Sequence, residues 1–110
     1  MKIHVAEVYQ VKYHAIDNFS NKQDIINRLL YDECQDLSWQ GEDVESSEQL
    51  EVSRKDLANL IAKICYNRQG YENWRRRTDI KESLDEIISI IAKWMAYSDS
   101  RNEYVVLTWF

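Results

Sequence analysis

The first residues of the chain alternate between apolar and polar side chains, as a β-strand with one buried face does. Over residues 2–16 the odd positions are mostly apolar or aromatic and the even positions mostly polar, so we predict one long strand there. Glu7 is the exception on the apolar face. Either this carboxylate is paired or lies near a sheet edge, or a β-bulge between Val5 and Tyr9 moves it off the apolar face.

Three later segments place apolar residues at helical spacing. The first predicted helix covers residues 20–37, with Ser20 and Gln23 as a capping box at its start. The second begins after Ser53, which forms a cap with Asp56, and Gly70 fits just beyond its end. The third covers residues 79–97.

The third predicted helix is apolar on two sides. Besides its main stripe it carries a second one, formed by Ile90, Trp94 and Tyr97. A helix of this kind lies in the centre of a domain or at a subunit interface.

Residues 103–110 predict a last strand with two apolar faces. One face carries Tyr104, Val106 and Phe110, and the other carries Val105, Leu107 and Trp109. A strand of this kind is covered on both sides, either by a second subunit or by the third helix and a loop of the same chain. Leu50 and Val52 also allow a very short strand.

These elements predict a single α+β domain over residues 1–110. We expect a small two- or three-stranded sheet, formed by the N- and C-terminal strands and packed against three helices. The 110 residues include two glycines and no proline, which indicates few tight turns and argues against sandwiches, barrels and propellers. Gly41 and Gly70 are too far apart for a glycine-rich phosphate loop.

Charge is strongly segregated along the chain, whose net charge is -5. Residues 32–51 contain eight acidic side chains and no basic one, whereas residues 66–77 contain four arginines and one glutamate. These two segments are therefore the candidate contact regions.

Few residues of the sequence suggest a catalytic or metal-binding role. Cys34 and Cys65 fall on the apolar stripes of different predicted helices, where we expect buried, inert thiols. His4 and His14 would lie roughly 33 Å apart along one strand, so we expect neither a metal site nor a cofactor. A buried Glu7 would have a raised pKa and the properties of a general base, whereas a paired edge carboxylate would not. We expect no enzymatic activity.

Aromatic and basic residues alternate over residues 66–77, as in proteins that bind single-stranded nucleic acid. The candidate contacts are Tyr71, Trp74, Arg75, Arg76 and Arg77. Against this, the chain is acidic and three consecutive arginines fan out around a helix. The alternatives are that Trp74 anchors the turn between two helices, and that the arginines pair with the acidic segment within the chain or between subunits.

The acidic segment, predicted to be an exposed loop, also has two interpretations. It is either a solvated loop or a contact for a basic protein partner, with Trp39 as the anchoring aromatic. The candidate acidic contacts are Glu42, Asp43 and Glu45.

The patterns together favour a small, non-enzymatic, cytoplasmic interaction protein. We expect it to self-associate as a homodimer through the last strand and the third helix, with Val105, Leu107, Trp109, Ile90, Trp94 and Tyr97 as contacts. Nucleic-acid binding and inhibition of a basic protein are the alternatives. No secretory signal is expected, because Glu7 interrupts the only apolar stretch near the N-terminus. No membrane-spanning segment is expected either, because Ser89 and Lys93 interrupt the most apolar helix candidate, residues 87–96, which is far shorter than a bilayer requires.

Overall fold

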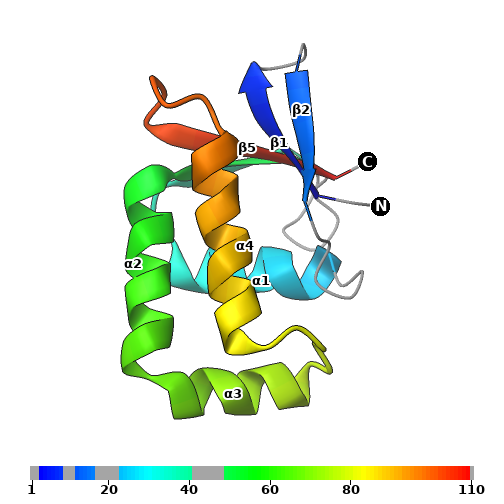
Figure 1. The fold of residues 1–110 in the computed structure, drawn as a ribbon, viewed down its shortest axis with the longest axis vertical. Helices are drawn as coiled ribbons and strands as arrows, with labels where there is room; N and C mark the ends of the chain where they lie inside the picture. Colours follow the sequence, from blue (N-terminus) through cyan, green and yellow to red (C-terminus); the bar gives the residue numbers. More distant parts are fainter. Residues whose placement is uncertain (1–2, 9–11, 17–22, 41–48, 110) are drawn as a thin grey trace.

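Strands and helices are mixed along the chain in the computed structural model, which describes residues 3–8, 12–16, 23–40 and 49–109 (Figure 1). The elements are β1 (Ile3–Val8), β2 (Lys12–Ile16), α1 (Gln23–Glu33), β3 (Leu37–Gln40), β4 (Gln49–Ser53), α2 (Arg54–Tyr66), α3 (Arg68–Arg77), α4 (Leu84–Tyr97) and β5 (Tyr104–Trp109). This arrangement confirms the predicted α+β class. It has one more helix than expected, and a larger sheet.

The strands form one antiparallel sheet in the order β2-β1-β5-β4-β3. The terminal strands are neighbours as predicted, with Ile3 opposite Trp109. The sheet has five strands rather than two or three, because the predicted first strand is a hairpin and because β3 joins β4. β5 is therefore the central strand.

The N-terminal hairpin corrects the prediction of one strand over residues 2–16. β1 and β2 pair with Ile3 opposite Ile16, and the residues that connect them lie outside the described part of the chain. Their register shifts between Ala6 and Val8, so the predicted bulge at Glu7 is confirmed. Odd positions of β1 lie opposite even positions of β2, as Ile3 does with Ile16, so the alternation predicted over residues 2–16 does not continue on one face of the sheet.

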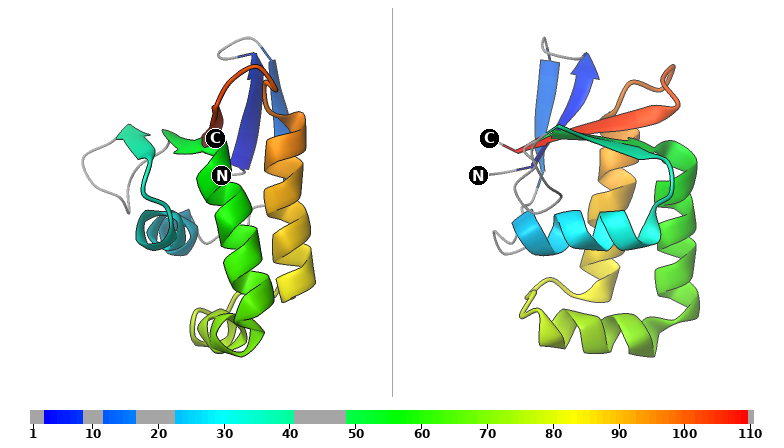
Figure 2. Two further views of the ribbon diagram at one scale, coloured as in Figure 1. Left: turned by 90° about the vertical axis from the view of Figure 1, so that its left-hand side faces the viewer. Right: turned by 180° about the vertical axis from the view of Figure 1, so that it is seen from behind.

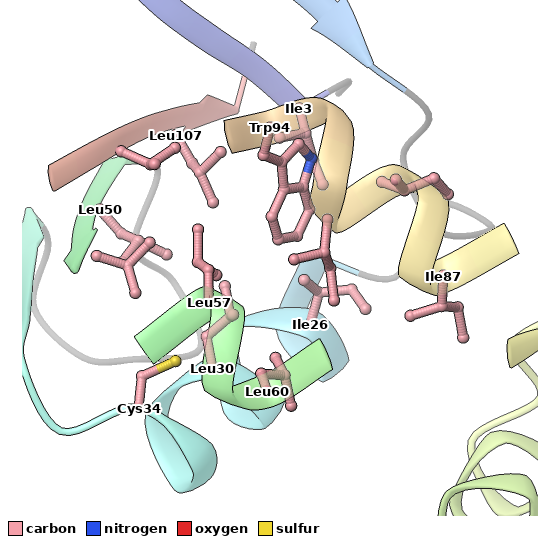
Figure 3. Packing of buried hydrophobic residues seen from close by; sticks show 14 of the residues in the cluster. Ile3, Ile26, Leu30, Cys34, Leu50, Leu57, Leu60, Ile87, Trp94 and Leu107 are labelled. Atoms are coloured by element: carbon pink, nitrogen blue, oxygen red, sulfur yellow. The ribbon is translucent and has the colours of Figure 1, made fainter. Parts of the chain in front are cut away.

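The core lies between one face of the sheet and the helices, where side chains from β1, β4 and β5 meet α1, α2 and α4 (Figure 3). Val105, Leu107 and Trp109 are 0%, 1% and 3% exposed and belong to this cluster. The chain's own helices therefore cover this face of β5.

The helix boundaries differ from the sequence prediction at several ends. α1 stops at Glu33 and Leu37 begins β3, while the predicted cap at Ser20 lies outside the described residues. α2 begins as predicted, because the Ser53 side chain accepts a hydrogen bond from the backbone N–H of Asp56. Val52 and Leu57, which flank this cap, are both fully buried, as in a hydrophobic staple.

The predicted third helix, over residues 79–97, begins only at Leu84 as α4, and a helix that was not predicted, α3, covers residues 68–77 before it. Gly70 does not end α2; it lies in the first turn of α3, where its N–H donates to the Asn67 side chain at 3.2 Å. The end of α3 is a Schellman motif, in which the N–H groups of Asp79 and Ile80 donate to the carbonyls of Arg76 and Arg75.

Candidate protein interface

The C-terminal end of α1 is held in place by a side chain of α2. The carboxylate of Asp56 accepts hydrogen bonds from the backbone N–H groups of Gln35 and Asp36, at 3.1 and 2.8 Å. These two N–H groups lie in the short connection between α1 and β3, which has no helical partner for them. Asp56 therefore fixes the position of this connection relative to α2.

Glu33, the last residue of α1, contacts both α2 and α3. Lys63 of α2 donates to the carbonyl oxygen and to the carboxylate of Glu33, each at 3.3 Å. Burial, the charge of Glu33 and a hydrogen bond to Glu33 raise the pKa of Tyr71 in α3 to about 12. Three helices are thus joined at one carboxylate.

Cys34 follows Glu33 in the chain and is buried, with 6% of its surface exposed. Burial and the nearby carboxylates of Asp56 and Glu33 raise the pKa of its thiol to about 12, although Lys63 acts in the opposite direction. The thiol is therefore protonated near neutral pH. Because the thiolate is the nucleophilic form, this environment disfavours thiol chemistry.

A groove with a volume of about 920 Å³ opens above the network, between the end of α1 and the outer side of α2. Its acidic wall is formed by Glu33 and Asp36, and its other wall includes Lys55, Asn59 and Tyr66 of α2. The Asp36 carboxylate also accepts a hydrogen bond of 2.8 Å from the hydroxyl of Tyr104, which raises the pKa of that phenol. Most of the side chains that line the groove are polar or charged.

The outer side of α2 is exposed in the protein. α2 forms an edge of the molecule beside α4 in Figure 1 and faces the viewer in the left view of Figure 2. Lys55, Asn59 and Ala62 are exposed, and Tyr66 is 92% exposed, the highest value among the exposed large hydrophobic residues described. An aromatic ring at the rim of a groove is a typical anchor of protein interfaces.

A second hollow, of about 680 Å³, lies on the other side of the first turn of α2. Arg54 is one of the residues that line it, and it donates hydrogen bonds to Met95 O at 2.9 Å, to Ser98 Oγ at 2.7 Å and to Asp99 O at 3.0 Å. A cation that satisfies carbonyls at a helix C-terminus stabilises the end of that helix. We assign this arginine a structural role.

The structure separates the candidate nucleic-acid contacts on α3. Tyr71 and Trp74 pack against the core, and Arg75 donates to the Glu72 carboxylate and, at 3.0 Å, to Ile80 O. Of the five candidates only Arg76 and Arg77 are exposed, so they do not form one stacking and phosphate-binding surface.

Among the described residues, arginines of α3 contact acidic side chains of α3 and α4. The hydrogen bond and charge of Arg75, together with the charge of Arg76, hold the pKa of Glu72 below its usual range. Arg68 forms an ion pair of 3.0 Å with Asp85. These acidic partners belong to α3 and α4, whereas the candidate acidic contacts Glu42, Asp43 and Glu45 lie outside the described residues. Trp39 is placed on β3.

The predicted self-association contacts lie mostly inside the chain. Ile90 and Trp94 are 3% and 1% exposed and join Val105, Leu107 and Trp109 in the core, so these five residues do not present a contact surface. Their burial follows from the central position of β5 and from the packing of α4 on the sheet. The sixth predicted contact, Tyr97, is 44% exposed and lies at the surface.

The structure also changes the expected positions of the histidines and the expected burial of one cysteine. His4 and His14 are not at opposite ends of one strand, because the hairpin places them opposite Ala15 and Val5 respectively. Cys65 is exposed, which corrects the expectation of a buried thiol, and Glu7 is half-buried at the bulge. Within the described ranges, the histidine, cysteine and acidic side chains form no group of three or more suited to hold a metal ion.

The exposed side of α2 was missed by the sequence analysis, which followed apolar stripes. The available signal was Tyr66, an aromatic residue that lies off the stripe of Leu57, Leu60 and Ile64. Among the helices of the described segments, none has the length and apolar character needed to cross a membrane. Comparison with models of protein families, with curated proteins and with solved structures finds no match to this chain.

Proposed function

We propose that this protein is a non-enzymatic interaction protein that self-associates, and that it does so through the exposed side of α2 and the adjoining groove. The observation that carries the proposal is Tyr66, which is 92% exposed at the rim of a groove of about 920 Å³. Tyrosine supplies large contact area with little loss of side-chain entropy, and it is enriched in protein interfaces.

The groove supports binding better than catalysis. Its carboxylates are engaged in structural contacts: Asp56 with two backbone N–H groups, and Glu33 with Lys63. The thiol beneath them is held in its protonated form by its raised pKa. A nucleophile paired with a base, which covalent catalysis requires, is not assembled among these residues.

We also propose a reducing, cytoplasmic location. Cys34 and Cys65 are both free thiols in the structure, one buried and one exposed. An exposed free thiol is more typical of compartments that keep cysteines reduced.

Self-association is tested by light scattering and sedimentation velocity over a wide concentration range. We expect the mean mass to rise from the monomer towards the dimer as concentration increases. Tyr66→Ala should shift this transition to higher concentration, whereas Tyr97→Ala, which removes an exposed tyrosine from α4, should leave it unchanged. A strictly monomeric chain at every concentration contradicts the proposed function.

A further inference from the structure

Four exposed residues of α2 form a straight stripe on its outer side: Lys55, Asn59, Ala62 and Tyr66. Their spacing alternates between four and three residues, as in the contact positions of a coiled coil. With about 100° per residue, they fall within an arc of roughly 60° on the helix surface. This arc lies opposite the buried residues Leu57, Leu60 and Ile64.

The stripe is symmetric about its own midpoint. Lys55 and Tyr66 lie equally far from the peptide bond between Leu60 and Ile61, and so do Asn59 and Ala62. In two antiparallel helices related by a two-fold axis at this midpoint, position 55 therefore meets position 66 of the other copy. Antiparallel helices pair their contact positions in this way, and a two-fold interface requires such self-complementarity.

We propose that two copies of the chain pair through α2 in antiparallel orientation, with the Lys55 ammonium over the ring of Tyr66 of the partner subunit. The inference rests on the proposed self-association and names its contact. A two-fold axis forms the contact twice, each time as a cation–π interaction. Asn59 then faces the small side chain of Ala62 of the partner subunit, which lets the helices approach closely.

The charges and the shape of this side of the molecule support a second copy as the occupant. The groove beside α2 has the carboxylates of Glu33 and Asp36 on its far wall, so a second α2 brings the cation of its Lys55 to a side of the molecule that carries acidic residues. The two Lys55 side chains of such a pair lie roughly 16 Å apart along the helix axis, which limits their repulsion. Among the described residues, Figures 1 and 2 show no other helix over the outer side of α2.

Substitutions that change the charges at positions 55 and 66 test the proposed pairing. Lys55→Glu removes the cation, and Tyr66→Lys places two cations opposite each other. We expect either variant to weaken the dimer by about tenfold, because both copies of the contact are lost. The double variant should recover most of the affinity, because each position then meets an opposite charge.

Mixing the two single variants gives the sharpest readout. In a mixed pair, the new carboxylate at position 55 meets the new lysine at position 66, and the unchanged Lys55 meets the unchanged Tyr66. An equimolar mixture should therefore dimerise, by light scattering, at a concentration at which each variant alone is monomeric. Lys93→Glu and Tyr97→Ala, both at exposed positions of α4, are the matched controls and should leave the dimer unchanged.

Each negative result of these experiments overturns a different part of the proposal. A dimer that is insensitive to both single variants overturns the α2 pairing and leaves self-association standing. Weakened single variants without recovery in the mixture or in the double variant overturn the antiparallel register. A wild-type chain that never dimerises overturns the proposed function as well. Because Ala62→Arg blocks the close approach by bulk alone, it tests the same contact independently of charge, with Ala96→Arg on α4 as its control.

Discussion

Arg54, the first residue of α2, donates a hydrogen bond of 2.9 Å to the carbonyl oxygen of Met95 in the last turn of α4. The same guanidinium also reaches Ser98, Asp99 and Asn102, so one side chain holds the connection from α4 to β5. Residues more than 40 positions apart in the sequence are joined there.

Replacing Arg54 should therefore destabilise the fold. We expect Arg54→Met to lower the free energy of unfolding by about 2–3 kcal/mol, because several charge-assisted hydrogen bonds to part-buried carbonyls are lost. Urea denaturation monitored by tryptophan fluorescence measures the change. Arg77→Met, at an exposed position of α3, is the control and should change stability by less than about 0.5 kcal/mol. Equal effects of the two substitutions would show that Arg54 has no special role.

Asp56 should contribute more than an ordinary acidic residue in a first turn. Asp56→Ala removes the acceptor for the N–H groups of Gln35 and Asp36, and we expect a loss of about 1.5–3 kcal/mol. Asp85→Ala removes an exposed acidic residue from the first turn of α4 and should cost about 0.5 kcal/mol. Amide hydrogen exchange of Gln35 and Asp36 should also accelerate in Asp56→Ala alone; unchanged protection there would contradict this role.

Asp79 adopts a left-handed backbone conformation, with φ of 55°, at the Schellman end of α3. We expect Asp79→Gly to raise stability by about 0.5–1 kcal/mol, because glycine adopts positive φ without steric strain. Asp79→Val should lower it by about 1–2 kcal/mol, since a β-branched residue is strained there. Thermal unfolding of the three proteins provides the ranking, and a valine variant as stable as the glycine variant would be incompatible with this conformation.

Alkaline pH should weaken the contact between Tyr71 and Glu33. The phenol has a pKa of about 12 in the folded protein and of about 10 in an unfolded chain. The folded state thus holds this proton more tightly, so its contribution is complete below pH 10 and is lost as the pH rises from about 10 to 12. Urea denaturation at pH 8 and pH 11 should show a smaller alkaline loss for Tyr71→Phe than for the wild type. Tyr97→Phe serves as the control, and identical losses in all three proteins would refute the prediction.

The two cysteines should differ sharply in reactivity. Cys65 is exposed, whereas Cys34 is buried and its pKa is raised to about 12. We expect one thiol to react rapidly with an aromatic disulfide reagent at pH 8 and the second only after unfolding. Cys65→Ser should abolish the rapid phase, and Cys34→Ser should retain it. A rapid phase that survives in Cys65→Ser would place Cys34 at the surface.

The sequence predicted local features well where both partners are close in the chain. The Ser53 cap of α2 and the bulge at Glu7 were read from short patterns and are present in the structure. The prediction failed where one pattern covered two elements. Residues 2–16 were predicted as one strand and form two, and the helix predicted to end at Gly70 consists of α2 and the start of α3, which begins at Arg68.

The candidate contact surface was harder to predict, because a local pattern does not show which partner covers a side chain. Val105, Leu107 and Trp109 are equally apolar whether a second subunit or the chain's own helices cover them. The arginines of α3 form a basic cluster in the sequence, but Arg75 turns to Glu72 and Ile80 once the helix forms.

By itself, the sequence determined the α+β class, the start of α2 and the buried stripes, because these depend on residues a few positions apart that satisfy each other's backbone groups and share one face. Only the tertiary structure decided that β5 is the central strand, that Val105, Leu107 and Trp109 face the chain's own helices and that Tyr66 remains outside. Strand order and helix packing depend on contacts between segments far apart in the chain. Apolar patterning shows that a face must be covered, without showing which segment covers it.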